Sequence, residues 1–220
     1  HDRGRRRRVV RRASSAAGWF GVGVACVGSG RAMNLVRARD VMGLPVVSIA
    51  SGEDVAEVRD VVYDGEAHRL VGFTLNKRGM FAGRLKAVLA AGSVAAIGPD
   101  AVMIDAESAI DDSGGRGAGL DDLGAARPVI GNRVLSADGS DLGEVVAVIL
   151  STGDELCAVG YELQSADRSD TSFVPISAQM ALSGENLVLP AEATAFVRND
   201  LAGFGAAIAS YRSPEMEKNQ

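Results

Sequence analysis

The middle of this chain carries one sequence pattern twice. Residues 46–61 (VVSIASGEDVAEVRDV) return as residues 133–148 (RVLSADGSDLGEVVAV). Each occurrence predicts a strand, a glycine-centred turn and a longer strand. The ends agree as well, because residues 90–104 align without gaps on residues 175–189. An internal repeat must form the same supersecondary unit each time, so the sequence predicts two small β domains of about 70 to 80 residues each.

Composition supports this division of the chain. Aromatic residues make up only 5% of the 220 residues, and short strands rich in Val, Ile and Leu suit such a composition. Residues 33–109 are predicted to form the first domain, and residues 120–190 the second. Between them, residues 110–119 (IDDSGGRGAG) have the composition of a flexible linker.

A change of period after Pro190 predicts a C-terminal helix over residues 191–212. Its apolar positions recur at steps of three and four and therefore share one face: Ala193, Val197, Leu201, Phe204, Ile208 and Tyr211. Two interpretations stay open for this face. The helix either covers one of the chain's own sheets or docks on a partner or a second copy.

The first 32 residues differ from the rest. They hold eight arginines against one aspartate, a local charge of +7, whereas the other 15 basic and 27 acidic residues give −12. Residues 1–32 are either sequence upstream of a true start at Met33 or a poorly ordered extension, a secretory signal or anchor, or a basic arm that touches lipid or nucleic acid. The acidic body disfavours nucleic acid as a partner of the folded part, since phosphate binding needs clustered Lys and Arg.

Several stretches resemble the PRC-barrel family, which is named for a module shared by the photosynthetic reaction centre H subunit and a ribosome-maturation factor. In the first repeat they are residues 43–46 (GLPV), 57–64 (EVRDVVYD), 71–73 (VGF) and 94–102 (VAAIGPDAV), and in the second Gly139, residues 142–145 (LGEV), 159–161 (VGY) and 174–176 (VPI). The resemblance implies a mainly β protein with two tandem small β-barrels and a C-terminal helix, used mainly in assembly and protein contact.

The residue types of catalytic and metal sites are scarce in the body of the chain. It has one histidine, His68, which lies in a predicted turn and is expected to face solvent, and one cysteine, Cys157, expected as a small core residue. Acid pairs at Asp111–Asp112 and Asp121–Asp122 fall in or beside the linker, where geometry is not fixed. We therefore predict no enzyme activity, no catalytic residue, no metal and no cofactor.

The best candidate for a partner contact is the loop of residues 77–86. Met80 and Phe81 lie there between Arg78 and Arg84, in an otherwise acidic protein. An apolar pair with a basic rim suits an acidic partner or an anionic membrane. The alternative is that Phe81 folds back over its own sheet.

Together these features predict a non-enzymatic adaptor or assembly module that binds another protein, or itself, through barrel faces and loops. The alternatives are a ribosome-maturation or RNA-processing factor, and a membrane-associated, H-subunit-like support of electron or proton transfer. We expect a cytoplasmic location, with membrane contact only through residues 1–32.

Overall fold

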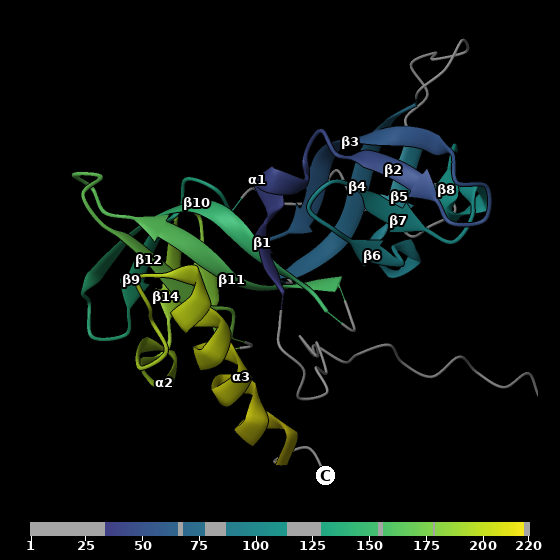
Figure 1. The fold of residues 1–220 in the computed structure, drawn as a ribbon. Helices are drawn as coiled ribbons and strands as arrows, with labels where there is room; N and C mark the ends of the chain where they lie inside the picture. The colour runs from purple at the N-terminus through teal and green to yellow at the C-terminus, as the bar shows by residue number, and fades with distance from the viewer. Residues whose placement is uncertain are drawn as a thin grey trace, which may run out of the picture.

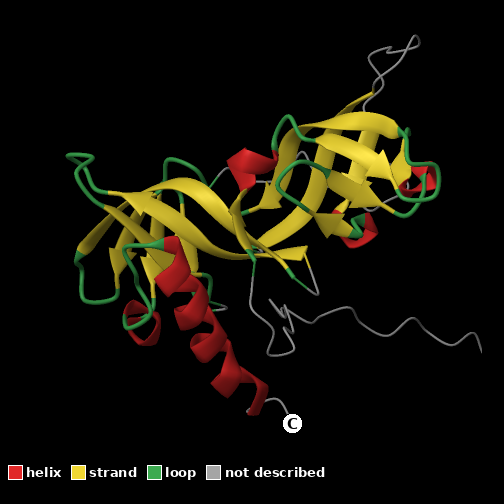
Figure 2. Ribbon diagram, in the orientation of Figure 1, coloured by secondary structure: helices red, strands yellow, loops and turns green. Residues whose placement is uncertain are grey.

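The computed structural model describes residues 34–65, 68–77, 87–113, 129–153, 156–177 and 179–217. As predicted, the fold is mainly β: it has two seven-stranded sheets, and a helix follows the second (Figure 1). Figure 2 shows strands as the dominant element of both halves.

The first sheet takes all its strands from residues 45–111. Its strand order is β6-β7-β2-β3-β4-β5-β8. The strands are β2 (Pro45–Ser48), β3 (Asp54–Asp64), β4 (Arg69–Lys77), β5 (Ala87–Ala90), β6 (Ala96–Ile97), β7 (Val102–Ile104) and β8 (Ile110–Asp111). Two short 3-10 helices, η1 (Ala91–Ser93) and η2 (Glu107–Ala109), interrupt the second half of this region.

The order of the second sheet is β12-β11-β10-β9-β14-β13. Read from the other edge it matches β6-β7-β2-β3-β4-β5 of the first sheet, and instead of a counterpart of β8 it has an extra strand, β1, which pairs with β10. Its strands are β1 (Leu35–Arg37), β9 (Arg133–Ser136), β10 (Asp141–Thr152), β11 (Leu156–Gln164), β12 (Thr171–Pro175), β13 (Ala181–Ser183) and β14 (Asn186–Leu189).

The two sheets agree in register as well as in order. Both contain one parallel pair, in which Val46 lies opposite Val102 in the first sheet and Val134 opposite Leu187 in the second. The long strands of both hairpins also shift register at two corresponding points. In β3 the shifts lie between Val58 and Asp60 and between Val62 and Tyr63. In β10 they lie between Val145 and Ala147 and between Ile149 and Leu150. A β-bulge bends a strand and increases its twist, so both long strands bend at the same two places.

Strand β1 precedes the first sheet in sequence but belongs to the second. Leu35, Val36 and Arg37 pair antiparallel with Ser151, Leu150 and Ile149 of β10. The helical turn α1 (Ala38–Val41) follows and contacts both β3 and β10, so it lies between the sheets (Figure 1). The sequence pattern did not indicate that residues 35–37 complete the distant sheet.

The hydrophobic cores of the two sheets are continuous. One cluster of buried residues runs from Val46, Phe73 and Leu89 of the first sheet to Tyr161 and Leu187 of the second. A smaller cluster lies under the C-terminal helix and contains Ile149, Val159, Phe173, Phe204 and Ile208. Since burial of apolar surface is the main stabilising term, the sheets stabilise each other.

Two predicted boundaries need correction. The region after Pro190 is not one helix over 191–212 but a turn of helix, α2 (Ala191–Thr194), and a separate α3 (Leu201–Glu217). Asp200 separates them because its carboxylate accepts a hydrogen bond from the Gly203 amide at 2.7 Å, as an N-cap does. The predicted linker begins too early, because Ile110 and Asp111 pair with β5 as β8.

Candidate functional site: the joint between the sheets

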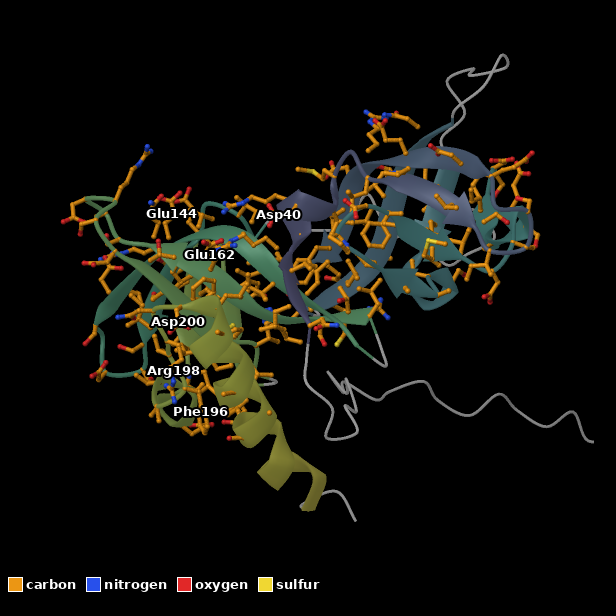
Figure 3. The ribbon with its side chains drawn as sticks, viewed as in Figure 1. Asp40, Glu144, Glu162, Phe196, Arg198 and Asp200 are labelled. Atoms are coloured by element: carbon orange, nitrogen blue, oxygen red, sulfur yellow. The ribbon has the colours of Figure 1, made fainter. Side chains whose placement is uncertain are left out.

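A buried carboxylate of the second sheet holds the segment that precedes the first sheet. The carboxylate belongs to Glu162, which is labelled in Figure 3. It accepts bonds from Arg37, at 2.7 Å from Nε and 3.0 Å from Nη2, and lies 3.3 Å from Nη2 of Arg39. The side chain of Glu162 is 6% exposed and that of Arg37 28%. The Arg37 guanidinium also lies 5.7 Å from the centre of the Phe173 ring. The hydrogen bond to Glu162 raises the pKa of Arg37, and this bidentate pairing fixes β1 in direction as well as in place.

A second polar cluster joins the sheets through Tyr161 of β11, which is fully buried. Its hydroxyl lies 2.6 Å from the Tyr63 hydroxyl at the end of β3 and 2.7 Å from Nδ1 of His68. Tyr63 and His68 both belong to the first sheet's β3–β4 hairpin, so one hydroxyl of the second sheet binds two residues of the first.

His68 is a correction to the sequence prediction, which placed it in solvent. It lies in the β3–β4 turn as expected, but it is only 5% exposed because its ring lies against Tyr161 of the second sheet. Its φ of 49° lies in the left-handed region, which few residues other than glycine, Asn and Asp adopt. A turn that is half of a domain contact looks like any other turn in sequence, so burial could not be read from the pattern.

The pKa directions define the protonation state of this cluster. Burial lowers the pKa of His68, and a hydrogen bond to the backbone of Met180 and the charge of Asp64 oppose this only in part. Burial likewise raises the pKa of both Tyr63 and Tyr161. At neutral pH the cluster therefore consists of a neutral imidazole and two neutral phenols.

When the His68 ring is neutral, every hydrogen bond of the cluster can form, and all of them run in the same donor-to-acceptor direction. The Met180 bond raises the His68 pKa, so the ring donates to the Met180 backbone. The other nitrogen, Nδ1, then accepts from the Tyr161 hydroxyl, which in turn accepts from Tyr63. This arrangement uses each donor once and links the two sheets through Tyr161.

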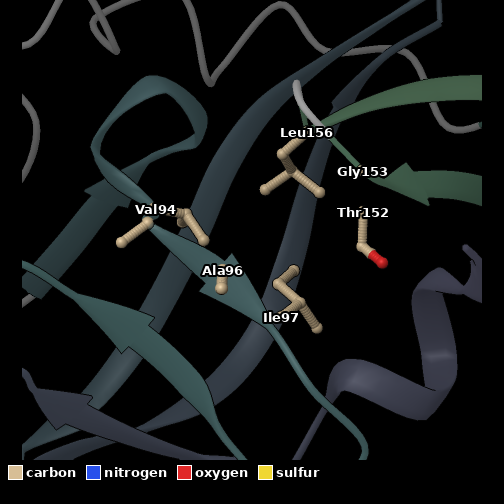
Figure 4. A pocket seen from close by; sticks show the side chains of 7 residues that line it. Val94, Ala96, Ile97, Thr152, Gly153 and Leu156 are labelled. Atoms are coloured by element: carbon tan, nitrogen blue, oxygen red, sulfur yellow. The ribbon is translucent and has the colours of Figure 1, made fainter. Parts of the chain in front are cut away.

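A crevice lies beside the joint and is too small for an organic ligand. Val94 to Ile97 form one wall, and Thr152, Gly153 and Leu156 of the second sheet form the other (Figure 4). Its free volume is about 30 Å³, whereas small-molecule sites usually measure several hundred. It can hold about one water molecule.

The partner-contact candidates of the sequence lie elsewhere. Arg78, Met80, Phe81 and Arg84 all fall outside the described residues, so the loop of residues 77–86 stays a prediction. Within the described part of the chain, three large apolar side chains are exposed: Met42 (45%), Ile49 (57%) and Ile130 (53%).

Two of these exposed residues occupy the same turn of the two sheets. Met42 precedes Gly43, whose amide donates to Val58, and Ile130 precedes Gly131, whose amide donates to Val145. Both glycines have positive φ, 84° and 89°. The turn therefore presents an apolar side chain outward twice, a feature that the sequence repeat contained but that was not recognised in it.

Cys157 was expected as a small core residue, and it is half-buried and packs against the cluster under α3. It is also disulfide-bonded. The sequence has one other cysteine, Cys26, which lies outside the described residues.

Neither a metal-binding cluster nor a membrane-spanning helix occurs within the described ranges. No group of three His, Cys, Asp or Glu side chains is arranged there to hold an ion. None of the helices in that part of the chain combines the length and the apolar character needed to cross a membrane. Of the acid pairs, Asp111 belongs to β8 and Asp112 to the turn after it, while Asp121 and Asp122 fall outside the described residues.

Fold and joint together define a β-sheet protein whose two halves share one topology. Residues 33–109 match the family model of the PRC-barrel domain, so the chain contains one PRC-barrel domain, formed by β1, α1 and the first sheet up to η2. Of the second sheet, the match includes only β1. No curated protein matches the chain.

Proposed function

We propose that the chain is a non-enzymatic assembly module that binds a protein partner through two PRC-barrel-type units held as one body. The observation that carries the proposal is the joint. Strand β1, the Glu162 ion pairs and the Tyr161 cluster fix the orientation of the two sheets. A fixed pair of surfaces binds with less loss of conformational freedom than two flexibly linked domains.

The second sheet is the second such unit in this proposal. Its strand order, its parallel pair and its two bulges correspond to those of the first sheet. Two glycines also correspond, because each lies close to a backbone carbonyl of the neighbouring strand. A Cβ on Gly72 would collide with the Leu89 carbonyl, and a Cβ on Gly160 would lie 2.5 Å from the Val174 carbonyl. Agreement at such positions is expected of duplicated units.

The partner contact is proposed to include the turns of Met42 and Ile130. An exposed apolar side chain is common on any surface and carries little weight alone. Here the same turn exposes one in each unit, which gives a partner two equivalent anchors. The loop with Arg78, Met80, Phe81 and Arg84 is kept as a further contact.

The test is purification of the tagged full chain from its source organism, followed by reconstitution with the purified partner. We expect a stoichiometric protein partner that the double variant Met42→Ser/Ile130→Ser loses, while the matched control Ile49→Ser keeps it. A variant Phe81→Ser tests the loop in the same assay. Light scattering of the purified chain tests self-association.

Two outcomes would overturn the proposal. One is a monomer that captures no stoichiometric protein. The other is turnover of a small substrate by the purified chain. Capture of ribosomal subunits in place of a single protein would favour the RNA-processing alternative.

A further inference from the structure

The joint contains a titratable ring, His68, whose described hydrogen bonds lead to the second half of the chain. They join the ring to the Tyr161 hydroxyl of β11 and to the backbone of Met180, just before β13. Histidine is the side chain whose ordinary pKa lies closest to physiological pH. The position of the ring therefore couples protonation to the contact between the sheets.

Protonation of His68 would reverse the donor and acceptor roles along this chain of hydrogen bonds. A charged imidazole has two N–H donors and no acceptor. The Tyr161 hydroxyl, which donates to Nδ1 of the neutral ring, would have to accept from it and turn its own proton toward Tyr63. Tyr63 could then no longer donate to Tyr161, so the cluster would be rearranged as far as the end of β3.

Charges around the ring do not compensate for burying the cation. Among the residues that the structure describes, the titratable groups around it are Asp64 and Tyr63 of β3 and Tyr161 of β11, and of these only Asp64 is a carboxylate. Burial outweighs the attraction to Asp64, since the pKa of His68 is lowered overall. The left-handed backbone of His68 adds strain that the contacts with the second sheet must offset.

We infer that His68 is a pH-sensitive release point of the joint: its protonation breaks its contacts with Tyr161 and Met180 while both sheets stay folded. Strand β1 and the Glu162 ion pairs still connect the halves in the released state, because none of these contacts involves His68. The inference concerns the joint itself and holds whether or not the chain binds the proposed partner.

The experiment is hydroxyl-radical footprinting of the full chain between pH 7.5 and pH 5.0, with the labelled side chains quantified by mass spectrometry. Tyr161 reports release. Phe73 is the internal control, because it is also fully buried and occupies the corresponding place in the first sheet. We expect labelling of Tyr161 to rise several-fold on acidification while that of Phe73 stays constant.

The matched variant is His68→Asn. Asparagine tolerates the left-handed backbone and offers an acceptor near the position of Nδ1, but it does not titrate in this range. We expect its Tyr161 labelling to be independent of pH. If the variant does not fold, the midpoint of Tyr161 labelling in the native chain must coincide with the titration of the His68 ring by NMR, in a His1→Gln background that leaves one histidine signal.

Three results would overturn the inference. The first is constant labelling of Tyr161 while the His68 ring titrates. The second is an equal rise of Tyr161 and Phe73, which indicates acid unfolding of the whole chain. The third is an unchanged pH response in His68→Asn.

Discussion

The two sheets share one topology, and they differ where they touch each other. Phe73 and Tyr161 occupy corresponding places, opposite Val61 and Val148 respectively, and both are fully buried. The next position holds Thr74 in the first sheet and Glu162 in the second. The first sheet therefore has an apolar ring and a small hydroxyl where the second has a phenol and a carboxylate.

Those polar groups of the second sheet bind the first sheet or the segment that leads into it. Tyr161 binds Tyr63 and His68 of the β3–β4 hairpin, and Glu162 binds Arg37 of β1 and Arg39 of α1. The lesson is that a duplicated fold can become an asymmetric pair by changing two neighbouring residues of one strand. Each new polar group finds a partner on the other half, which limits the cost of burying it.

The largest expected effect comes from the helix that covers only the second sheet. Phe204 of α3 is fully buried, and its ring centre lies 5.8 Å from that of Phe173. We expect Phe204→Ala to lower the free energy of unfolding by about 3–5 kcal/mol, the usual cost of removing a buried aromatic ring. Urea unfolding measures this, and Ala206→Ser on the exposed side of α3 is the control. A loss below 1 kcal/mol would mean that the second sheet, like the first, does not depend on this helix.

A smaller effect is expected at the glycines that correspond in the two sheets. A Cβ on Gly160 would overlap the Phe204 ring and lie 2.5 Å from the Val174 carbonyl, whereas one on Gly72 would meet only backbone atoms of Leu89 and Ala90. Overpacking costs about 1–3 kcal/mol, and we expect both Gly→Ala variants to lose stability, Gly160→Ala more.

A double-mutant cycle separates the two causes. Phe204→Ala should relieve part of the cost of Gly160→Ala and none of the cost of Gly72→Ala, because only Gly160 contacts the ring. Equal coupling at both glycines would contradict the assignment.

At the joint itself, Tyr161→Phe gives the second sheet the ring that the first sheet has. It removes the hydroxyl that binds Tyr63 and His68, and we expect a loss of about 1–3 kcal/mol, since a buried nitrogen of His68 is left without its partner. The reciprocal change Phe73→Tyr puts a hydroxyl into the core of the first sheet and should also destabilise the chain. Thermal unfolding of both variants gives the comparison. A stable Tyr161→Phe protein would show that the joint does not depend on this hydroxyl.

The sequence repeat predicted the strands that the two sheets have in common, and it missed the elements that only one sheet has. The alignment of residues 46–61 with residues 133–148 placed β2, β3, β9 and β10 and gave the class of fold. It could not place β1, because three residues without a period do not reveal that their partner is β10. The break before α3 was visible in principle, since Asp200 is a good N-cap, but the apolar period continues across it and suggested one helix.

The joint was missed for a related reason. The exchange of Phe73-Thr74 for Tyr161-Glu162 could be read from the repeat, and polar groups at a position buried in the other unit indicate a contact. Sequence does not show which turn supplies the partner, so His68 was expected in solvent. The loop of Arg78, Met80, Phe81 and Arg84 stays a prediction.

The smallest predicted effect is a pH dependence of stability that only the joint confers. The pKa of His68 is lowered in the folded chain, so above the unfolded value of about 6.5 both states are neutral and the residue contributes nothing. As the pH falls below that value, the unfolded chain binds a proton that the folded chain does not, and the free energy of unfolding declines until the folded pKa is passed. The carboxylates with lowered pKa, Asp138, Asp141 and Asp167, act at lower pH, because their unfolded pKa lies near 4. Urea unfolding between pH 7.5 and 5.0 should therefore show a decline in the native chain that His68→Asn lacks, and parallel curves for the two proteins would remove His68 as its source.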